Sequence, residues 1–373
     1  MTKLFHRGEE LKQPDVWIQI TVPNEFQPIG KFNIGVTAGI ETTVCDPSWI
    51  DGINRMNLTL VSSTHAKGVF EQSAFEQKDQ QTNQTVRVIK LEKPVEVLFE
   101  GVDLNKYFHI EASELPKTDL VKDLDSIQES FAYLYVGHWL QGEVGEDRKN
   151  TGLLLKLFLE TFKGKGSKPA LVLKTSSATS SIMDRDEVLK KIDAIRTLVG
   201  GNDLPNVYLL HGELDDRDIN ELYNHPKIKA MVSFTRGEGY GRPLAEFCLS
   251  KKPIIASGWS GHMDFLSPEF CTLIPGEVKQ IHPSAVVPNI LLKESGWFAV
   301  NEKMAAKALE NVYQNYSKYE VGGKRQGHKI KTEFNYENMQ LLLGSYLDKH
   351  VPKQVQLKLP QLKKIELPKL KTT

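Results

Sequence analysis

Short apolar runs alternate with longer amphipathic stretches along most of the chain. The apolar runs have the length of buried strands, and they lie at 16–22, 32–36, 58–62, 131–136, 170–174, 207–210, 230–234 and 253–256. Between the later runs, apolar residues recur at helical spacing, at 151–162, 186–198, 215–223 and 243–250. Strands separated by helices predict an α/β fold with parallel sheets and crossover helices.

A polar segment at 115–128 contains a proline and comes directly before a new apolar run. Such a change in pattern predicts a domain boundary. We expect a smaller α/β domain at 1–127 and a larger domain at 128–349. The larger domain should close with helices at 301–318 and 336–348.

The last residues, 350–373, differ from the rest of the chain because they are rich in proline, lysine and leucine. Pro352, Pro360 and Pro368 prevent a long helix here. We interpret this basic tail as extended. Its role is either that of a solvated terminus or that of a contact for a docking partner or a polyanion.

Composition narrows the class of protein. The formal net charge is +0, with 40% hydrophobic and 25% charged residues, which is typical of a globular protein and gives no general reason to expect a nucleic-acid or membrane partner. The three cysteines, at 45, 248 and 271, are widely spaced and form no zinc-binding pattern. A polar N-terminus and the lack of a long apolar run predict a cytoplasmic protein without a membrane span.

The stretch Ser233–Glu246, SFTRGEGYGRPLAE, carries the clearest chemistry. Three glycines separate a predicted strand from a predicted helix that has Pro243 in its first turn. A loop of this kind presents free backbone N–H groups to an anion such as a diphosphate. Phosphates repel carboxylates, so Glu238 and Glu246 are expected to bind sugar hydroxyls instead. The alternative is a structural loop with two incidental acids.

This stretch resembles the signature of the retaining GT-B glycosyltransferases of family 4, a pattern like S-x-x-E-G-F-G-x-P-x-x-E. The resemblance implies two Rossmann-like domains facing a cleft, a nucleotide-diphosphate sugar as donor, and transfer of a hexose or pentose with retention at the anomeric carbon. It also implies that Glu238 contacts the transferred sugar and that Glu246 contacts the ribose hydroxyls. The distal phosphate would be held by the backbone amides of Gly239, Tyr240, Gly241 and Arg242.

Three further positions follow from the same resemblance. The family's donor domain has a basic residue ahead of a helix that neutralises the diphosphate; Lys149 matches it, with Arg148 beside it. His262 lies in SGHMDF, which resembles a branch of the family, and is expected to contact donor or acceptor. Many members have a catalytic histidine in the first domain; here Glu41 is the nearest polar candidate.

The resemblance also implies that the first domain is reduced. Family members usually carry about one more βαβ unit, with a glycine-rich loop, ahead of the segment that matches 14–23. Three explanations stay open: a genuinely smaller domain, a start that omits part of it, or completion by another chain.

A metal-dependent reaction is not expected. The pairs Asp123/Asp125 and Asp184/Asp186 formally match the DxD metal motif of the other glycosyltransferase fold. Both pairs lie in polar segments that do not follow an apolar strand, and we interpret them as solvated faces. We therefore expect no metal and no cofactor, since the nucleotide sugar is a substrate.

The acceptor is open between two classes. A glycan or lipopolysaccharide precursor is the commonest acceptor in the family. The first domain also resembles glycosyltransferases of tailed bacteriophages, some of which modify hydroxymethylated DNA bases in the host cytoplasm. A third alternative is a non-catalytic nucleotide-sugar-binding subunit that needs a partner. The sequence does not indicate the sugar, the nucleotide base or the oligomeric state.

Overall fold

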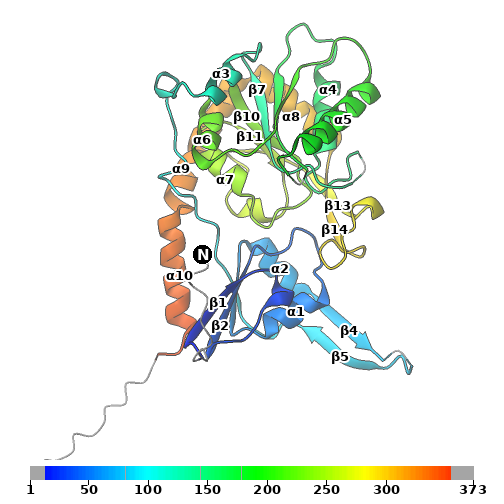
Figure 1. Cartoon of the computed structure of the whole chain (residues 1–373), viewed down its shortest axis with the longest axis vertical. Helices are drawn as coiled ribbons and strands as arrows, with labels where there is room; N and C mark the ends of the chain where they lie inside the picture. Colours follow the sequence, from blue (N-terminus) through cyan, green and yellow to red (C-terminus); the bar gives the residue numbers. More distant parts are fainter. Residues whose placement is uncertain (1–12, 80, 143, 178, 354–373) are drawn as a thin grey trace, which may run out of the picture.

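Two parallel β-sheets organise the chain, one in each of two α/β units (Figure 1). The structure is a computed structural model that describes residues 13–79, 81–142, 144–177 and 179–353. Most of the predicted basic tail, residues 354–373, lies outside the described residues. In Figure 1 the first unit is at the bottom and the second unit is at the top.

The sheet of the first unit has four parallel strands in the order β1-β2-β3-β6. The strands predicted in the first third of the chain are confirmed, and the fourth was not predicted. Their bounds are β1 (Val16–Ile20), β2 (Phe32–Thr37), β3 (Leu58–Val61) and β6 (Val95–Val97). The helices α1 (Pro47–Asn54) and α2 (Thr64–Gln72) start at side-chain caps, Asp46 and Ser63. An antiparallel hairpin, β4 (Ala74–Lys78) and β5 (Thr85–Lys90), extends away from the sheet (Figure 1).

The second unit contains six parallel strands in the order β12-β11-β10-β7-β8-β9. Five of them follow the predicted apolar runs. Their bounds are β7 (Ala132–Val136), β8 (Ala170–Lys174), β9 (Val207–Leu210), β10 (Ile228–Ser233), β11 (Ile254–Ser257) and β12 (Thr272–Ile274). The chain starts in the middle, at β7, builds outward through β8 and β9, and then returns to β10 on the other side. The strand order therefore reverses between β7 and β10.

Helices cover both faces of this sheet, and each face has its own apolar core. The helices are α3 (Asp119–Asp125), α4 (Thr151–Phe162), α5 (Ile182–Val199), α6 (Asp216–Asn224), α7 (Arg242–Cys248) and α8 (Glu302–Gln314). An antiparallel pair, β13 (Gly276–Gln280) and β14 (Gly296–Val300), extends toward the first unit (Figure 1). No helix in the described ranges is long and apolar enough to cross a membrane.

The last two helices join the units. α9 (Tyr316–Glu333) packs on α7 of the second unit, whereas α10 (Tyr336–His350) lies against the first sheet (Figure 1). Leu343 and Leu347 pack with the apolar side chains of β2 and β3, and the Tyr346 hydroxyl donates to Val97 O at 2.9 Å. The sequence analysis had assigned this helix to the larger domain. The chain instead returns to the unit in which it began.

Candidate active site

The motif loop lies where the strand order reverses. β10 ends at Ser233 and α7 begins at Arg242, which confirms the predicted succession of strand, glycine-rich loop and helix. Gly241 caps the helix with a φ of +102°, a left-handed conformation that favours glycine. In open parallel sheets, the carboxyl ends of the strands beside such a reversal are where ligands bind. The loop after β7 meets the loop after β10 at this position.

Glu238 and Lys149 form an ion pair between these two loops. The Lys149 ammonium lies 2.6 and 2.7 Å from the two carboxylate oxygens of Glu238. Glu238 is only 8% exposed, and burial alone would raise its pKa. The positive charges of Lys149 and Arg148 outweigh burial and lower the pKa of Glu238 to about 2. The carboxylate is therefore ionised at neutral pH.

Arg148 links this pair to the first unit. Its guanidinium lies 3.4 Å from a carboxylate oxygen of Glu41 and 4.0 Å from one of Glu238, and it donates to Gly237 O at 3.3 Å. Glu41 follows β2 in the first unit, while Arg148 and Glu238 belong to the second. The four residues whose charged side chains the sequence analysis selected as catalytic or diphosphate-binding, Glu41, Arg148, Lys149 and Glu238, thus lie in one cluster across the two units.

Asp147 holds the basic residues in place, and sequence reasoning missed it. It is fully buried, and its carboxylate accepts hydrogen bonds from Thr151 N at 3.1 Å and Gly152 N at 3.4 Å at the start of α4. Burial raises the pKa of Asp147. Asn150 takes a left-handed φ of +56°, which tightens the turn that carries Arg148 and Lys149. An acidic residue shortly before a predicted helix was the available signal.

Two glycines of the motif allow the units to touch. A Cβ added to Gly237 would lie 1.8 Å from Glu41 O, and a Cβ added to Gly239 would lie 2.4 Å from Ala38 O. The Ser62 hydroxyl lies 2.6 Å from Ala38 O and 3.0 Å from Gly239 O. The sequence analysis had assigned the glycines to close contact with a ligand. In this structure the same feature also seats the first unit on the motif loop.

Glu246 lies one turn into α7 and is paired with Arg242 rather than with the central cluster. The Arg242 Nε lies 3.3 Å from a Glu246 carboxylate oxygen. Glu246 is 8% exposed, and burial raises its pKa to about 7, with Arg242 opposing the rise. Its carboxyl group therefore changes charge near neutral pH.

His262 is fully buried close to the motif loop, beside Gly241. Its Nε2 lies 2.6 Å from Ser257 O, which requires a proton on Nε2 and leaves Nδ1 as an acceptor. This Nδ1 is buried, and no described residue hydrogen-bonds to it. Burial lowers the pKa of His262, so the ring is neutral and Nδ1 can accept a hydrogen bond from a hydroxyl group.

The two acidic pairs, Asp123/Asp125 and Asp184/Asp186, were interpreted as solvated, but one of the four carboxylates is buried. Asp184 is buried, and its carboxylate accepts from Ser177 N at 3.0 Å and lies 2.8 Å from His211 Nε2. The interpretation as a solvated face was therefore wrong for Asp184, because a local cap and a histidine replace water around it. Among the described residues, no group of three or more potential ligands from His, Cys, Asp and Glu could hold a metal ion.

No family model matches the chain, and no curated protein matches it in sequence. Solved structures do match its fold. A sucrose-phosphate synthase from Thermosynechococcus elongatus is 13% identical with a TM-score of 0.57, and the match covers 85% of this chain and 67% of that protein. Anabaena HepE in complex with UDP and glucose is 14% identical with a TM-score of 0.55, covering 85% and 72%. A glycosyltransferase from Rickettsia africae is 13% identical with a TM-score of 0.56, covering 85% and 70%.

The fold is GT-B. In this GT-B chain, Glu41, Arg148, Lys149 and Glu238 lie where the two Rossmann-like units meet, with Glu246 and His262 on the adjoining segments. The predicted α/β class with parallel sheets is confirmed. The functional roles of these residues stay predictions.

Proposed function

We propose that this chain is a metal-independent glycosyltransferase that moves a sugar from a nucleotide-diphosphate sugar to an acceptor hydroxyl, with retention at the anomeric carbon. The observation that carries this proposal is the ion pair of Glu238 and Lys149 at the reversal of strand order in a GT-B fold. A buried carboxylate and a half-buried ammonium at the carboxyl edge of a parallel sheet suit a ligand with both hydroxyl and phosphate groups.

The basic residues would stabilise the departing nucleoside diphosphate. As the glycosidic bond breaks, negative charge develops on the distal phosphate, and fixed positive groups lower the energy of that state most in a water-poor site. Lys149, Arg148 and the backbone amides of residues 239–242 would supply this stabilisation. Because Glu238 holds Lys149 before any ligand arrives, the ammonium needs little reorganisation when the diphosphate binds.

The remaining residues would bind the two sugar rings of the donor. We assign Glu238 and Glu41 to the transferred sugar, because they approach the cluster from opposite units. Glu246 would bind the ribose hydroxyls. The unpartnered Nδ1 of His262 supports a contact with a hydroxyl of donor or acceptor.

Uridine nucleotides are the first donors to test, because HepE was crystallised with UDP and with UDP-glucose. The test measures binding of a panel of nucleotide sugars by thermal shift, and then transfer of the best donor's sugar by mass spectrometry. Glu238→Gln and Lys149→Met should abolish transfer with the circular-dichroism spectrum unchanged. Glu187→Gln and Lys307→Met, which change exposed residues on α5 and α8, serve as controls. Near-normal turnover in either site variant would rule out the assigned roles.

Two acceptor classes are predicted: a glycan, and a hydroxymethylated DNA base of the kind that bacteriophage enzymes modify. Both acceptors are offered with the same donor, and the mass increase of the acceptor identifies the class. Donor binding without transfer to either acceptor, and without release of nucleoside diphosphate, would favour the alternative of a non-catalytic subunit.

A further inference from the structure

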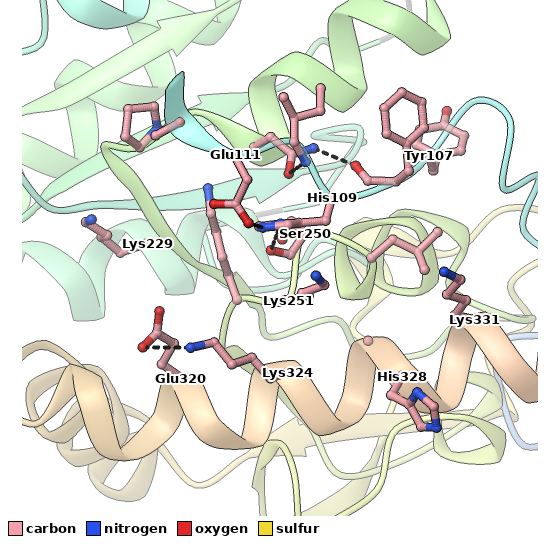
Figure 2. Close-up of a pocket in the computed structure, with 18 of the residues that line it drawn as sticks. Tyr107, His109, Glu111, Lys229, Ser250, Lys251, Glu320, Lys324, His328 and Lys331 are labelled. Carbon is pink, nitrogen blue, oxygen red and sulfur yellow. Dashed lines mark hydrogen bonds and ion pairs between the residues drawn. The ribbon is translucent and has the colours of Figure 1, made fainter. Parts of the chain in front are cut away.

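A large cavity lies on another part of the second unit, where α9 crosses the end of α7 (Figure 2). Its volume is about 1080 Å³, and none of the residues assigned to the donor lines it. Four segments border it: residues 104–112, residues 224–229 from the end of α6 to the start of β10, the loop 249–252 that follows α7, and one face of α9. Its lining contains five lysines but only two glutamates, namely Lys229, Lys251, Lys252, Lys324, Lys331, Glu111 and Glu320.

The wall formed by α9 is held firmly against the loop. Glu320, Lys324, His328 and Lys331 are spaced four, four and three residues apart, as on one broad helix face, and all four line the cavity. Glycines let this helix approach closely: a Cβ at Gly323 would lie 2.5 Å from the backbone of Lys252. The cavity therefore has preformed walls.

The positive charges in this cavity are not balanced by the protein. Glu111 lies 3.1 Å from His109, and Glu320 lies 3.5 Å from Lys324. Within the described ranges, no carboxylate forms an ion pair with Lys229, Lys251, Lys252 or Lys331, four lysines that we call the unpaired lysines.

Lys252 is held by backbone carbonyls instead of a carboxylate. Its ammonium donates to the carbonyl oxygens of Tyr223 at 2.7 Å and His225 at 2.8 Å. Burial and the like charge of Lys229 lower the pKa of Lys252 well below its usual value. A bound anion would relieve this repulsion.

Lys251 adds an independent observation, because its backbone is strained. It has a φ of +65°, a left-handed conformation that helix ends usually reserve for glycine or asparagine. A lysine that keeps this conformation beside a cavity is the kind of outlier that points to a function. The turn leaves the Lys251 side chain exposed at the cavity wall (Figure 2).

We propose that this cavity binds a small ligand that carries two or more phosphate groups. The ammonium groups of Lys229, Lys251 and Lys331 suit phosphate oxygens, which lysine binds as a point charge. The volume exceeds what one phosphate needs and lies near the upper end of the volumes of small-ligand sites. Four segments surround the space, which favours a compact ligand over the long backbone of a nucleic acid. The proposal does not depend on glycosyl transfer.

The test uses inorganic tripolyphosphate as the probe and isothermal titration calorimetry as the measurement. Lys149→Met is the starting protein, because it removes diphosphate binding expected at the donor site. Adding Lys251→Glu and Lys331→Glu should weaken binding by about tenfold or more. The control adds Lys307→Glu and Lys318→Glu, which change the net charge equally at exposed positions on α8 and α9 and should leave the affinity within about twofold.

Lys251→Gly separates ligand binding from structure. It relieves the left-handed strain and removes an ammonium group, so it should raise the midpoint of thermal unfolding while weakening tripolyphosphate binding. Absence of binding in the Lys149→Met protein would overturn the proposal. An equal loss in the control variant would also overturn it, and so would binding of duplex DNA, but not tripolyphosphate, through Lys251 and Lys331.

Discussion

The Lys149 ammonium and the Glu238 carboxylate face each other at 2.6 and 2.7 Å, although 89 positions separate them in the chain. Each side chain is at most 14% exposed, so the two charges depend on each other for compensation. Glu238 comes from the loop after β10 and Lys149 from the loop after β7. Because β7 and β10 are neighbours in the sheet, their two following loops bring Lys149 and Glu238 together.

Breaking this pair should cost stability as well as activity. Lys149→Met or Glu238→Gln alone should lower the free energy of unfolding by about 3 kcal/mol, because each leaves a buried partner charge less compensated. The double variant should lose less than the sum of the two, with a coupling energy of about 2 kcal/mol, while transfer stays abolished. Urea unfolding and a transfer assay provide the two measurements. Additive losses would show that the pair does not contribute as a unit.

The glycine contacts predict that closure of the two units depends on residues 237 and 239. Gly237→Ala would place a Cβ 1.8 Å from Glu41 O, and Gly239→Ala would place one 2.4 Å from Ala38 O; backbone oxygens cannot move aside as a side chain can. The first unit must then shift, and transfer should fall by about a hundredfold, since small misplacements carry such costs. Small-angle scattering should show a larger radius of gyration.

Gly166→Ala is the matched control for this series, because nothing lies within 4 Å of the added Cβ. It should leave both scattering and turnover unchanged. Full activity in Gly237→Ala would show that contact between the motif loop and the first unit is dispensable.

The raised pKa of Glu246 predicts a pH-dependent stability. Its folded pKa is about 7 against a usual 4.5, so the folded state holds this proton more tightly than the unfolded state. The resulting stabilisation is fully present below about pH 4.5 and is lost as pH rises through about 7, by at most about 3 kcal/mol. Glu246→Gln should flatten this part of the stability profile, measured by urea unfolding between about pH 5 and pH 8. Glu187→Gln, on the exposed face of α5, should keep the wild-type slope.

The local motif could be predicted because its information is local. The strand, the glycines and Pro243 follow one another in sequence. An apolar run followed by these residues predicts a strand, a turn and the start of a helix, and few other local structures fit it. The grouping of Lys149 with Glu238 followed from the family resemblance, since no pattern within one segment shows which loops become neighbours. The burial of Asp184 was missed because its partners, Ser177 and His211, lie on other segments.

The hairpin of the first unit and the placement of α10 could not be predicted from the sequence, for two other reasons. The strands β4 and β5 are largely exposed: β4 has only two apolar residues, and the alternation in β5 is short and rests on the exposed Val86 and Val88, so no buried face marks the hairpin. The apolar spacing of α10 indicated a helix, but it carries no information about which sheet the helix covers. Short connections usually keep a helix with the unit before it, and here the chain crosses back instead.

The crossing of α10 gives the last prediction. Leu347 packs on the first sheet, so Leu347→Ala should lower the free energy of unfolding of that unit by about 2 kcal/mol, the low end for a buried leucine because it is only half-buried. Leu341→Ala, on the same helix at 73% exposure, should change it by less than about 0.5 kcal/mol. Hydrogen exchange locates the effect: amides of β2 and β3 should lose protection in Leu347→Ala, while those of β10 should keep theirs. Equal loss in both sheets would show that the two units unfold as one.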